Sequence, residues 1–207
     1  DTVTLGQELV GAAAIRSIGS TSWSNPARVT ADDASYATMS NPGGVGGPYA
    51  SNFLVSDDFG FDLPTGAVVV GIQAILGDIF DDVGGRVYVT SVSLTNNGTQ
   101  ISGTDTKGGG TLTTSAATQT IGGTADTWGK SDWAIADIEH ADFGFEFALL
   151  KNSTADSPNV SLDYTAMNIY YTLPNTDGIR TTNFSFSGVL PADAVITGVE
   201  VDVQKSV

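Results

Sequence analysis

Short runs of alternating apolar and polar residues, separated by glycine-rich turns, make up most of this 207-residue chain. Residues 88–94 (YVTSVSL) and 143–150 (FGFEFALL) alternate with a period of two, and residues 160–172 (VSLDYTAMNIYYT) form a β-branched and aromatic run. Such runs are typical of β-strands with one buried face. Turn sequences lie at residues 41–48, 81–85, 96–98 and 107–110. The pattern predicts an all-β fold, an antiparallel β-sandwich of jelly-roll-like type.

The alternation also predicts which side chains are buried. One face of the run at residues 88–94 is expected to carry Tyr88, Thr90, Val92 and Leu94. Over the whole chain, the expected core consists of Phe59, Phe61, Ile72, Val92, Leu94, Phe143, Phe145 and Phe147. We expect these side chains to lie between the two sheets of the sandwich.

Helix signals are sparse, and we expect under about a tenth of the chain to be helical. Residues 8–16 (ELVGAAAIR) form one candidate helix, which Gly11 weakens. Residues 134–141 (AIADIEHA) form a candidate single turn, with Asp132 as its N-cap.

One segment of the chain occurs twice in related form. Residues 59–76 read FGFDLPTGAVVVGIQAIL, and residues 186–203 read FSGVLPADAVITGVEVDV. Both copies contain a Leu-Pro pair and then a strand glycine, Gly71 in the first copy and Gly198 in the second. The proline starts a turn because it fixes φ and has no N–H to donate. The glycine indicates a β-bulge or a close backbone approach.

The strand after Gly198 has one apolar and one polar face. Val199, Val201 and Val203 alternate with Glu200, Asp202 and Gln204. Because two strands alone are marginal in water, we expect the three valines to be buried against another chain or a further part of the protein. In the first copy, Ile75 stands where the second has Asp202. Ile75 is either a single exposed apolar side chain or part of a covered interface.

The domain organisation follows from these patterns. Residues 172–178 (TLPNTDG) combine Pro, Asn, Asp and Gly, which indicates a linker. We therefore expect an N-terminal arm or linker over residues 1–20, a β-sandwich domain over 21–173, and a linker with a partial second β unit over 174–207.

The charge balance limits the partners that this chain is expected to bind. It carries 23 acidic against 8 basic residues, for a net charge of −15. Such a surface repels nucleic acids and anionic membranes, so neither is an expected partner. The chain has no cysteine, which excludes disulfides, Cys-based zinc sites and thiol nucleophiles. This composition fits assembly in a reducing cytoplasm.

Several short segments follow one another in an informative order. They are WSNP (23–26), DDASYAT (32–38), SNFL (51–54), FGFDLPTGAVVVGI (59–72), GGTADTWG (122–129), ADIEHADFGFEF (136–147) and MNIYYT (167–172). Their order and spacing, over residues 20–172, resemble a β-sandwich module repeated in virion proteins of tailed bacteriophages and prophages. Residues 182–204 resemble the middle of the same module, without its Trp-x-Asn-Pro opening.

The resemblance implies a non-enzymatic structural protein of the virion, in a capsid decoration, a tail or a fibre. It implies other virion proteins and copies of the chain itself as partners, assembly in the host cytoplasm, and no catalytic residues. The alternative is a carbohydrate-binding β-sandwich that recognises a host-surface glycan. A glycan-degrading enzyme is a weaker hypothesis, because no paired-carboxylate motif is evident.

Acidic turns are the candidate metal sites. Asp78, Asp81 and Asp82 lie close together next to two glycines, and Asp57, Asp58 and Asp62 form a second group. Carboxylate oxygens on a sharply bent backbone suit Ca²⁺, although neither group has the spacing of an EF-hand loop. The alternative is that these are solvated turn carboxylates, in which case no cofactor is expected.

Aromatic residues and the single histidine are the remaining candidates. Trp128 and Trp133 flank a short loop and are a candidate stacking platform for a sugar ring; the alternative is that they anchor the core. His140 lies beside Glu139 and Asp142, and we interpret it as part of a surface turn rather than a catalytic group.

Overall fold

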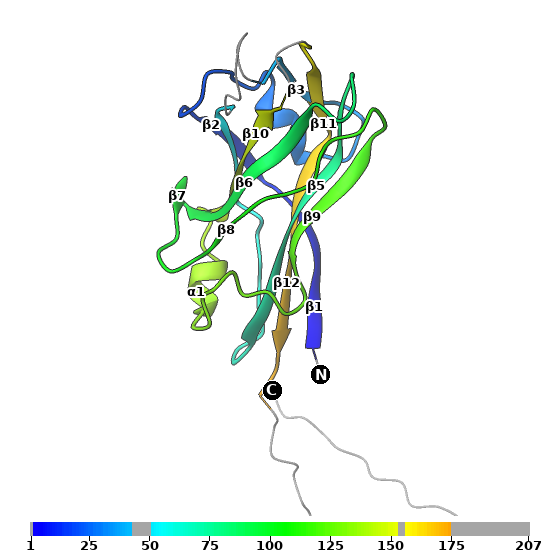
Figure 1. Cartoon of the computed structure of the whole chain (residues 1–207). Coiled ribbons are helices and arrows are strands. Elements are labelled where there is room, and N and C mark those ends of the chain that lie inside the picture. Colours follow the sequence, from blue (N-terminus) through cyan, green and yellow to red (C-terminus); the bar gives the residue numbers. More distant parts are fainter. Residues whose placement is uncertain (1, 43–50, 153–155, 175–207) are drawn as a thin grey trace, which may run out of the picture. The chain divides into compact units, whose positions relative to one another are not determined.

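The computed structural model describes residues 2–42, 51–152 and 156–174 (Figure 1). The chain divides into two compact units, residues 1–174 and residues 175–207. This division falls within the stretch for which the sequence predicted a linker. The second unit, with the expected interface residues Val199, Val201 and Val203, lies outside the described residues.

The first unit is an all-β sandwich. Its strands are β1 (Thr2–Leu9), β2 (Ala12–Arg16), β3 (Ala37–Ser40), β4 (Phe53–Asp57), β5 (Val68–Asp81), β6 (Val87–Asn96), β7 (Thr99–Gln100), β8 (Thr106–Lys107), β9 (Ala117–Gly123), β10 (Phe143–Lys151), β11 (Asn159–Leu162) and β12 (Tyr164–Thr172). One sheet has the order β1-β12-β5-β11-β3, with β9 also paired to β5. The other has the order β2-β4-β10-β6-β7, with β8 also paired to β6. Among the described residues, every pairing between these strands is antiparallel.

The core confirms the residues that the alternation predicted. Phe59, Phe61, Ile72, Val92, Leu94, Phe143, Phe145 and Phe147 are all buried and belong to one apolar cluster. The phenylalanine rings contact one another in a chain, with Phe145 stacked on Phe59 and tilted against Phe147. Such aromatic contacts add to the free energy that apolar burial supplies.

A β-bulge in β6 makes one face prediction wrong. The register of β6 with β10 shifts between Ala148 and Leu149, so Thr90 has no partner residue across the pair. An unpaired residue reverses the alternation of the strand. Val87 and Val89 therefore face the core before the bulge, and Val92 and Leu94 after it, while Tyr88 and Thr90 are only half-buried.

The N-terminal residues are part of the sandwich, so the expectations of an arm and of a helix over residues 8–16 are wrong here. β1 pairs with β12 in one sheet, and β2 pairs with β4 in the other. Gly11 joins the two strands, and its N–H donates to the carbonyl of Asp58 at 3.0 Å. A Cβ at Gly11 would collide with that carbonyl. Strand pairing and this close approach override the weak helix propensity of the alanines.

The single helical turn that the sequence predicted near residue 135 is confirmed as α1 (Ile135–Ile138). Its N-cap is Ala134 rather than Asp132, and Asp132 forms an ion pair with Lys130 instead. A 3₁₀ turn, η1 (Pro26–Thr30), is the other helical element of the described residues. Neither is a helix with the length and apolar character needed to cross a membrane.

The first copy of the repeated segment builds the centre of one sheet. The N–H of Ala67 donates to the carbonyl of Pro64 at 2.9 Å, which closes the predicted turn. The register of β5 with β12 shifts next to Gly71, and a Cβ at that glycine would collide with the backbone of Thr124. Both roles expected of the strand glycine are thus confirmed. Beyond it, β5 pairs with β12 and then β11 along one edge, and with β9 along the other.

Candidate functional site

An aspartate interrupts the long C-terminal run of the sandwich. Asp163 lies between β11 and β12, and both strands pair with β5. Its backbone N–H donates to the carbonyl of Gly77 at 3.3 Å, and its side chain is buried, with 1% of the residue exposed. Beside it in β5, Asp78 has a left-handed φ of 49° at a register shift between β5 and β9. Irregularities in two neighbouring strands thus bring these carboxylates to one point.

A loop after η1 brings a third carboxylate to this point. The backbone N–H of Ala34 donates to Oδ2 of Asp163 at 3.1 Å, which fixes the loop against the sheet. Asp32, two residues earlier, is exposed. One carboxylate oxygen from each of Asp32, Asp78 and Asp163 lies within 4.8 Å of the other two. Within the described residues, this is the one group of three metal-ligating side chains that converge in this way.

The electrostatics of this aspartate cluster (Asp32, Asp78 and Asp163) are unfavourable for three ionised carboxylates. Partial desolvation raises the pKa of Asp32, and the neighbouring charges of Asp163 and Asp78 raise it further. In the described residues, no Lys, Arg or His side chain forms an ion pair with any of the three. Oδ1 of Asp163 is buried without a hydrogen-bond partner. An unpaired buried carboxylate oxygen is costly because it has lost its hydration.

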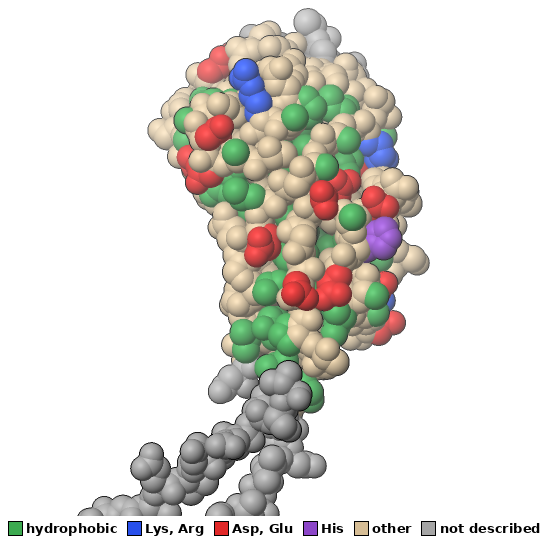
Figure 2. Space-filling model, turned by 180° about the vertical axis from the view of Figure 1, so that it is seen from behind, with side chains coloured by type: hydrophobic (Ala, Val, Ile, Leu, Met, Phe, Trp, Pro, Cys, Tyr) green, Lys and Arg blue, Asp and Glu red, His purple; other side chains and the backbone are tan. Residues whose placement is uncertain are grey.

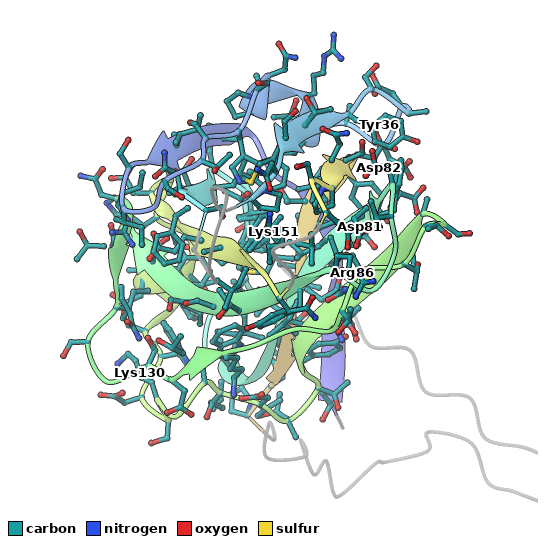
Figure 3. The ribbon with its side chains drawn as sticks, turned by 45° about the horizontal axis from the view of Figure 1, so that its top comes forward. Tyr36, Asp81, Asp82, Arg86, Lys130 and Lys151 are labelled. Atoms are coloured by element: carbon teal, nitrogen blue, oxygen red, sulfur yellow. The ribbon has the colours of Figure 1, made fainter. Side chains whose placement is uncertain are left out.

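The structure corrects the metal-site prediction from the acidic turn. Only Asp78 belongs to the cluster. Oδ1 of Asp81 accepts hydrogen bonds from the N–H groups of Val83 and Gly84, so this buried side chain closes the β5–β6 turn. Asp82 accepts two hydrogen bonds of 2.7 Å from Asn159. Asp81 and Asp82 therefore hold the turn in place (Figure 3).

Sequence reasoning missed Asp32 and Asp163 because their partners lie far away along the chain. One signal was present for Asp163: it is the only charged residue in the run from Val160 to Thr172. A carboxylate in an otherwise uncharged strand run indicates a specific role, since buried charge is costly. For Asp32, nothing in the local sequence distinguishes it from a solvated loop aspartate.

The second acidic group of the sequence is not a metal cluster in the structure. Asp57 lies at the end of β4, where burial raises its pKa and the carboxylates of Asp142 and Asp58 raise it further. Asp62 is exposed in the segment before β5. The described residues contain no convergence of Asp57, Asp58 and Asp62 on one point.

The two tryptophans are core residues, which corrects the stacking-platform hypothesis. Trp128 is fully buried, and its indole N–H donates to the carbonyl of Ile72 at 3.0 Å. Trp133 is 8% exposed, and its N–H donates to the carbonyl of Thr127 at 3.1 Å. A sugar needs an open ring face, and neither residue presents one.

Ile75 does not provide the exposed apolar surface that the interface hypothesis required. It is 4% exposed and lies in register between Ala166 of β12 and Thr120 of β9. The alternative of a single exposed apolar side chain is therefore wrong at this position.

A polar groove of about 440 Å³ lies on the sheet that contains β10. Its floor carries Glu146, which is 2% exposed and forms a two-point ion pair with Arg16, including a 2.7 Å bond from Nε. The guanidinium also lies 4.5 Å from the ring centroid of Phe53. The groove is further lined by Ser91, Ser93, Gly98, Thr99, Gln100 and Thr106. The hydroxyl and amide groups of this lining can donate and accept hydrogen bonds.

His140 lies in the turn after α1. Its Nδ1 accepts a hydrogen bond from the N–H of Asp142 at 3.1 Å and lies 3.7 Å from the Asp142 carboxylate. Half of the histidine side chain is exposed. The histidine thus shapes the turn that leads into β10.

No protein-family model, no curated protein and no solved structure matches this chain.

Proposed function

We propose that this chain is a non-enzymatic structural protein of a tailed-phage virion, in a capsid decoration, a tail or a fibre. Its role would be assembly through contacts between β-sheets. The observation that carries this proposal is the second copy of the β5 segment, residues 186–203.

In the first copy, every inward position after the strand glycine is fully buried. Ile72, Ala74 and Leu76 are 0% exposed and face the opposite sheet. The residues at the same positions of the second copy are Val199, Val201 and Val203. Full burial of one such side chain stabilises the folded or assembled state by about 1.5–3 kcal/mol, so three of them together contribute several kcal/mol. A sequence with this pattern is suited to lie at the centre of a sheet, under a second sheet.

The second copy consequently needs partner strands and a covering sheet. β5 has neighbours on both edges, and a strand without them presents open N–H and C=O groups. Chains that repeat one module commonly stack the copies or exchange strands with neighbouring subunits. Copies of this chain and other virion proteins are the proposed partners, and the virion, assembled in the host cytoplasm, is the proposed location.

Two further features support the proposal. The segments that resemble the virion module, from WSNP at residue 23 to MNIYYT at residue 167, lie within the described sandwich. The surface is strongly acidic, and Figure 2 shows many more acidic than basic side chains on the face that it presents. Such a surface favours solubility of a free subunit before assembly.

The test is to look for the chain in purified phage particles. Particles from a producing culture would be analysed by mass spectrometry and by cryo-electron microscopy. We expect the chain in a fixed, repeated copy number, with density for the sandwich in a symmetric array. A chain found only in the particle-free fraction would contradict the proposal.

Glycan recognition is the second candidate function, and the polar groove favours it. The ion-paired Glu146 lies next to hydroxyl and amide side chains there, a combination that suits sugar hydroxyl groups. A glycan array probed with the intact chain tests this candidate. A hit that is lost in Ser91→Ala but kept in Asp62→Ala, an exposed control outside the groove lining, would place the glycan in the groove. Binding to no glycan would leave only the structural role.

A further inference from the structure

The aspartate cluster is assembled by the fold rather than by a local sequence motif. Its members come from the loop after η1, from β5 and from the junction of β11 and β12. Asp163 is buried, Asp78 is half-buried and Asp32 is exposed, so the cluster leads from the interior to solvent. An ion can therefore enter from the Asp32 side.

The buried end of the cluster points to a positive ligand. Oδ2 of Asp163 is bound by the N–H of Ala34, but Oδ1 has no hydrogen-bond partner. The protein thus buries a carboxylate oxygen beside two other carboxylates and provides no cationic side chain for it within the described residues. A buried charge of this kind is normally paired or coordinates a metal.

The chemistry of the donors selects the ion. Ca²⁺ accepts six to eight oxygen ligands, carboxylates among them, in flexible geometry. The three ligand atoms lie within 4.8 Å of one another. Mg²⁺ needs a tighter octahedron of about 2.1 Å bonds and keeps most of its waters. A set made only of carboxylates also excludes metals that prefer nitrogen or sulfur.

We infer that Asp32, Asp78 and Asp163 bind a structural Ca²⁺ ion that fastens the loop after η1 to β5 and β12. The ion satisfies the free oxygen of Asp163 and offsets the mutual repulsion of the three carboxylates. Water completes its coordination on the exposed side. The site does not depend on the proposed function, since it concerns the stability of the sandwich alone.

Calorimetry and thermal unfolding of the full chain test the inference. The protein would be stripped with a chelator and then titrated with CaCl₂ and, separately, with MgCl₂. We expect one Ca²⁺ per chain and weaker binding of Mg²⁺. At a Ca²⁺ concentration about 100-fold above Kd, linkage predicts a rise in Tm of about 5–10 °C for a domain of this size. Absence of Ca²⁺ binding at millimolar concentration would overturn the inference.

Substitutions locate the ion. Asp163→Asn keeps an oxygen that can accept the hydrogen bond from Ala34 but removes a negative charge. We therefore expect this variant to lose the rise in Tm on addition of Ca²⁺. Its metal-free Tm should equal or exceed that of the metal-free wild type. Asp78→Asn, at a half-buried position, is the second variant in case the buried substitution prevents folding. The control is Asp62→Asn, which removes the same charge from an exposed aspartate outside the cluster. A response lost equally in the control would overturn the assignment.

A shared proton is the competing way to relieve the repulsion. If a proton rather than Ca²⁺ occupies the cluster, the metal-free wild type becomes more stable as pH falls and its Tm does not respond to Ca²⁺. That result would also overturn the inference. A Ca²⁺-dependent rise in Tm that disappears in Asp163→Asn and Asp78→Asn, and persists in Asp62→Asn, establishes the site.

Discussion

Trp128 donates its indole N–H to the backbone carbonyl of Ile72 across 3.0 Å, inside the fully buried core. This contact ties the loop after β9 to the centre of β5. The backbone of the same loop also meets β5, because the N–H of Ile72 donates to the carbonyl of Asp126 at 2.9 Å. The tryptophan is thus a structural anchor at the strand that the chain repeats.

Trp128→Phe should lower the free energy of unfolding by about 1–3 kcal/mol. The phenyl ring keeps most of the apolar contact but leaves a buried carbonyl without its donor. Urea denaturation measures the change, and Val68→Ala is the control because Val68 is 54% exposed. The control should change stability by under about 0.5 kcal/mol. A similarly small effect of Trp128→Phe would show that the indole N–H contributes nothing.

Arg16→Met should destabilise the domain more than the double variant Arg16→Met/Glu146→Met. The single change leaves the carboxylate of Glu146, 2% exposed, without its partner. We expect a loss of roughly 1–3 kcal/mol, below the value for a fully buried pair because the Arg16 side chain is 39% exposed. Replacing both residues removes the unpaired charge. Equal or greater destabilisation of the double variant in urea titrations would contradict this account.

Asp57→Asn should stabilise the domain at neutral pH and have little effect near pH 3. Burial and the carboxylates of Asp142 and Asp58 raise the pKa of Asp57 above the ordinary aspartate value of 3.8. The folded state therefore binds the proton more tightly than the unfolded state, and stability falls as pH rises through the raised pKa. Asparagine removes that charge, so we expect the free energy of unfolding at neutral pH to rise. The rise should stay under about 1 kcal/mol because solvent screens the repulsion. Thermal unfolding between pH 3 and pH 7 measures it, and a gain independent of pH would contradict the electrostatic cause.

Asp82→Ala should have the opposite pH dependence. Hydrogen bonds from the side chain and backbone of Asn159 lower the pKa of Asp82 below the ordinary aspartate value of 3.8. Its contribution is present above the unfolded pKa and is lost as pH falls through the lowered folded pKa. The variant should be less stable than the wild type at pH 7, by under about 1 kcal/mol, and the difference should shrink towards pH 2. The same thermal unfolding series measures both aspartates.

Removal of residues 175–207 should leave the sandwich folded and weaken assembly. Residues 1–174 form one compact unit, and its described part has its own apolar cluster. Light scattering coupled to size exclusion would compare the assembly of the shortened and full chains, with circular dichroism as the control for folding. Undiminished assembly would show that these residues are not an assembly element. Failure to fold would show that they belong to the core of the first domain.

Local patterns in the sequence were sufficient for the fold class. Alternation with a period of two identified the strands at β6 and β10 and eight buried core residues, because side chains on a pleated strand point to opposite faces. Pro64 and Gly71 were interpreted correctly because their backbone restrictions act at a single residue. Each of these features depends on residues close together in the chain.

The sequence could not show the features that depend on partners far away along the chain. The bulge at Thr90 reversed which side chains of β6 face the core, because the register of β6 is set by its pairing with β10. Residues 8–16 form parts of two strands because β12 and β4 offer edges with which they can pair. Trp128 was ambiguous until Ile72 provided its acceptor.

The aspartates show the same contrast between local sequence features and contacts made in three dimensions. The sequence by itself determined an acidic, all-β chain with strands, turns and a repeated segment, since composition, alternation and backbone restrictions act locally. Only the tertiary structure decided that Asp78 meets Asp32 and Asp163 rather than its neighbours Asp81 and Asp82. A convergence of charges is a property of distances in space, and the antiparallel pairing of β5 with β11 and β12 sets those distances.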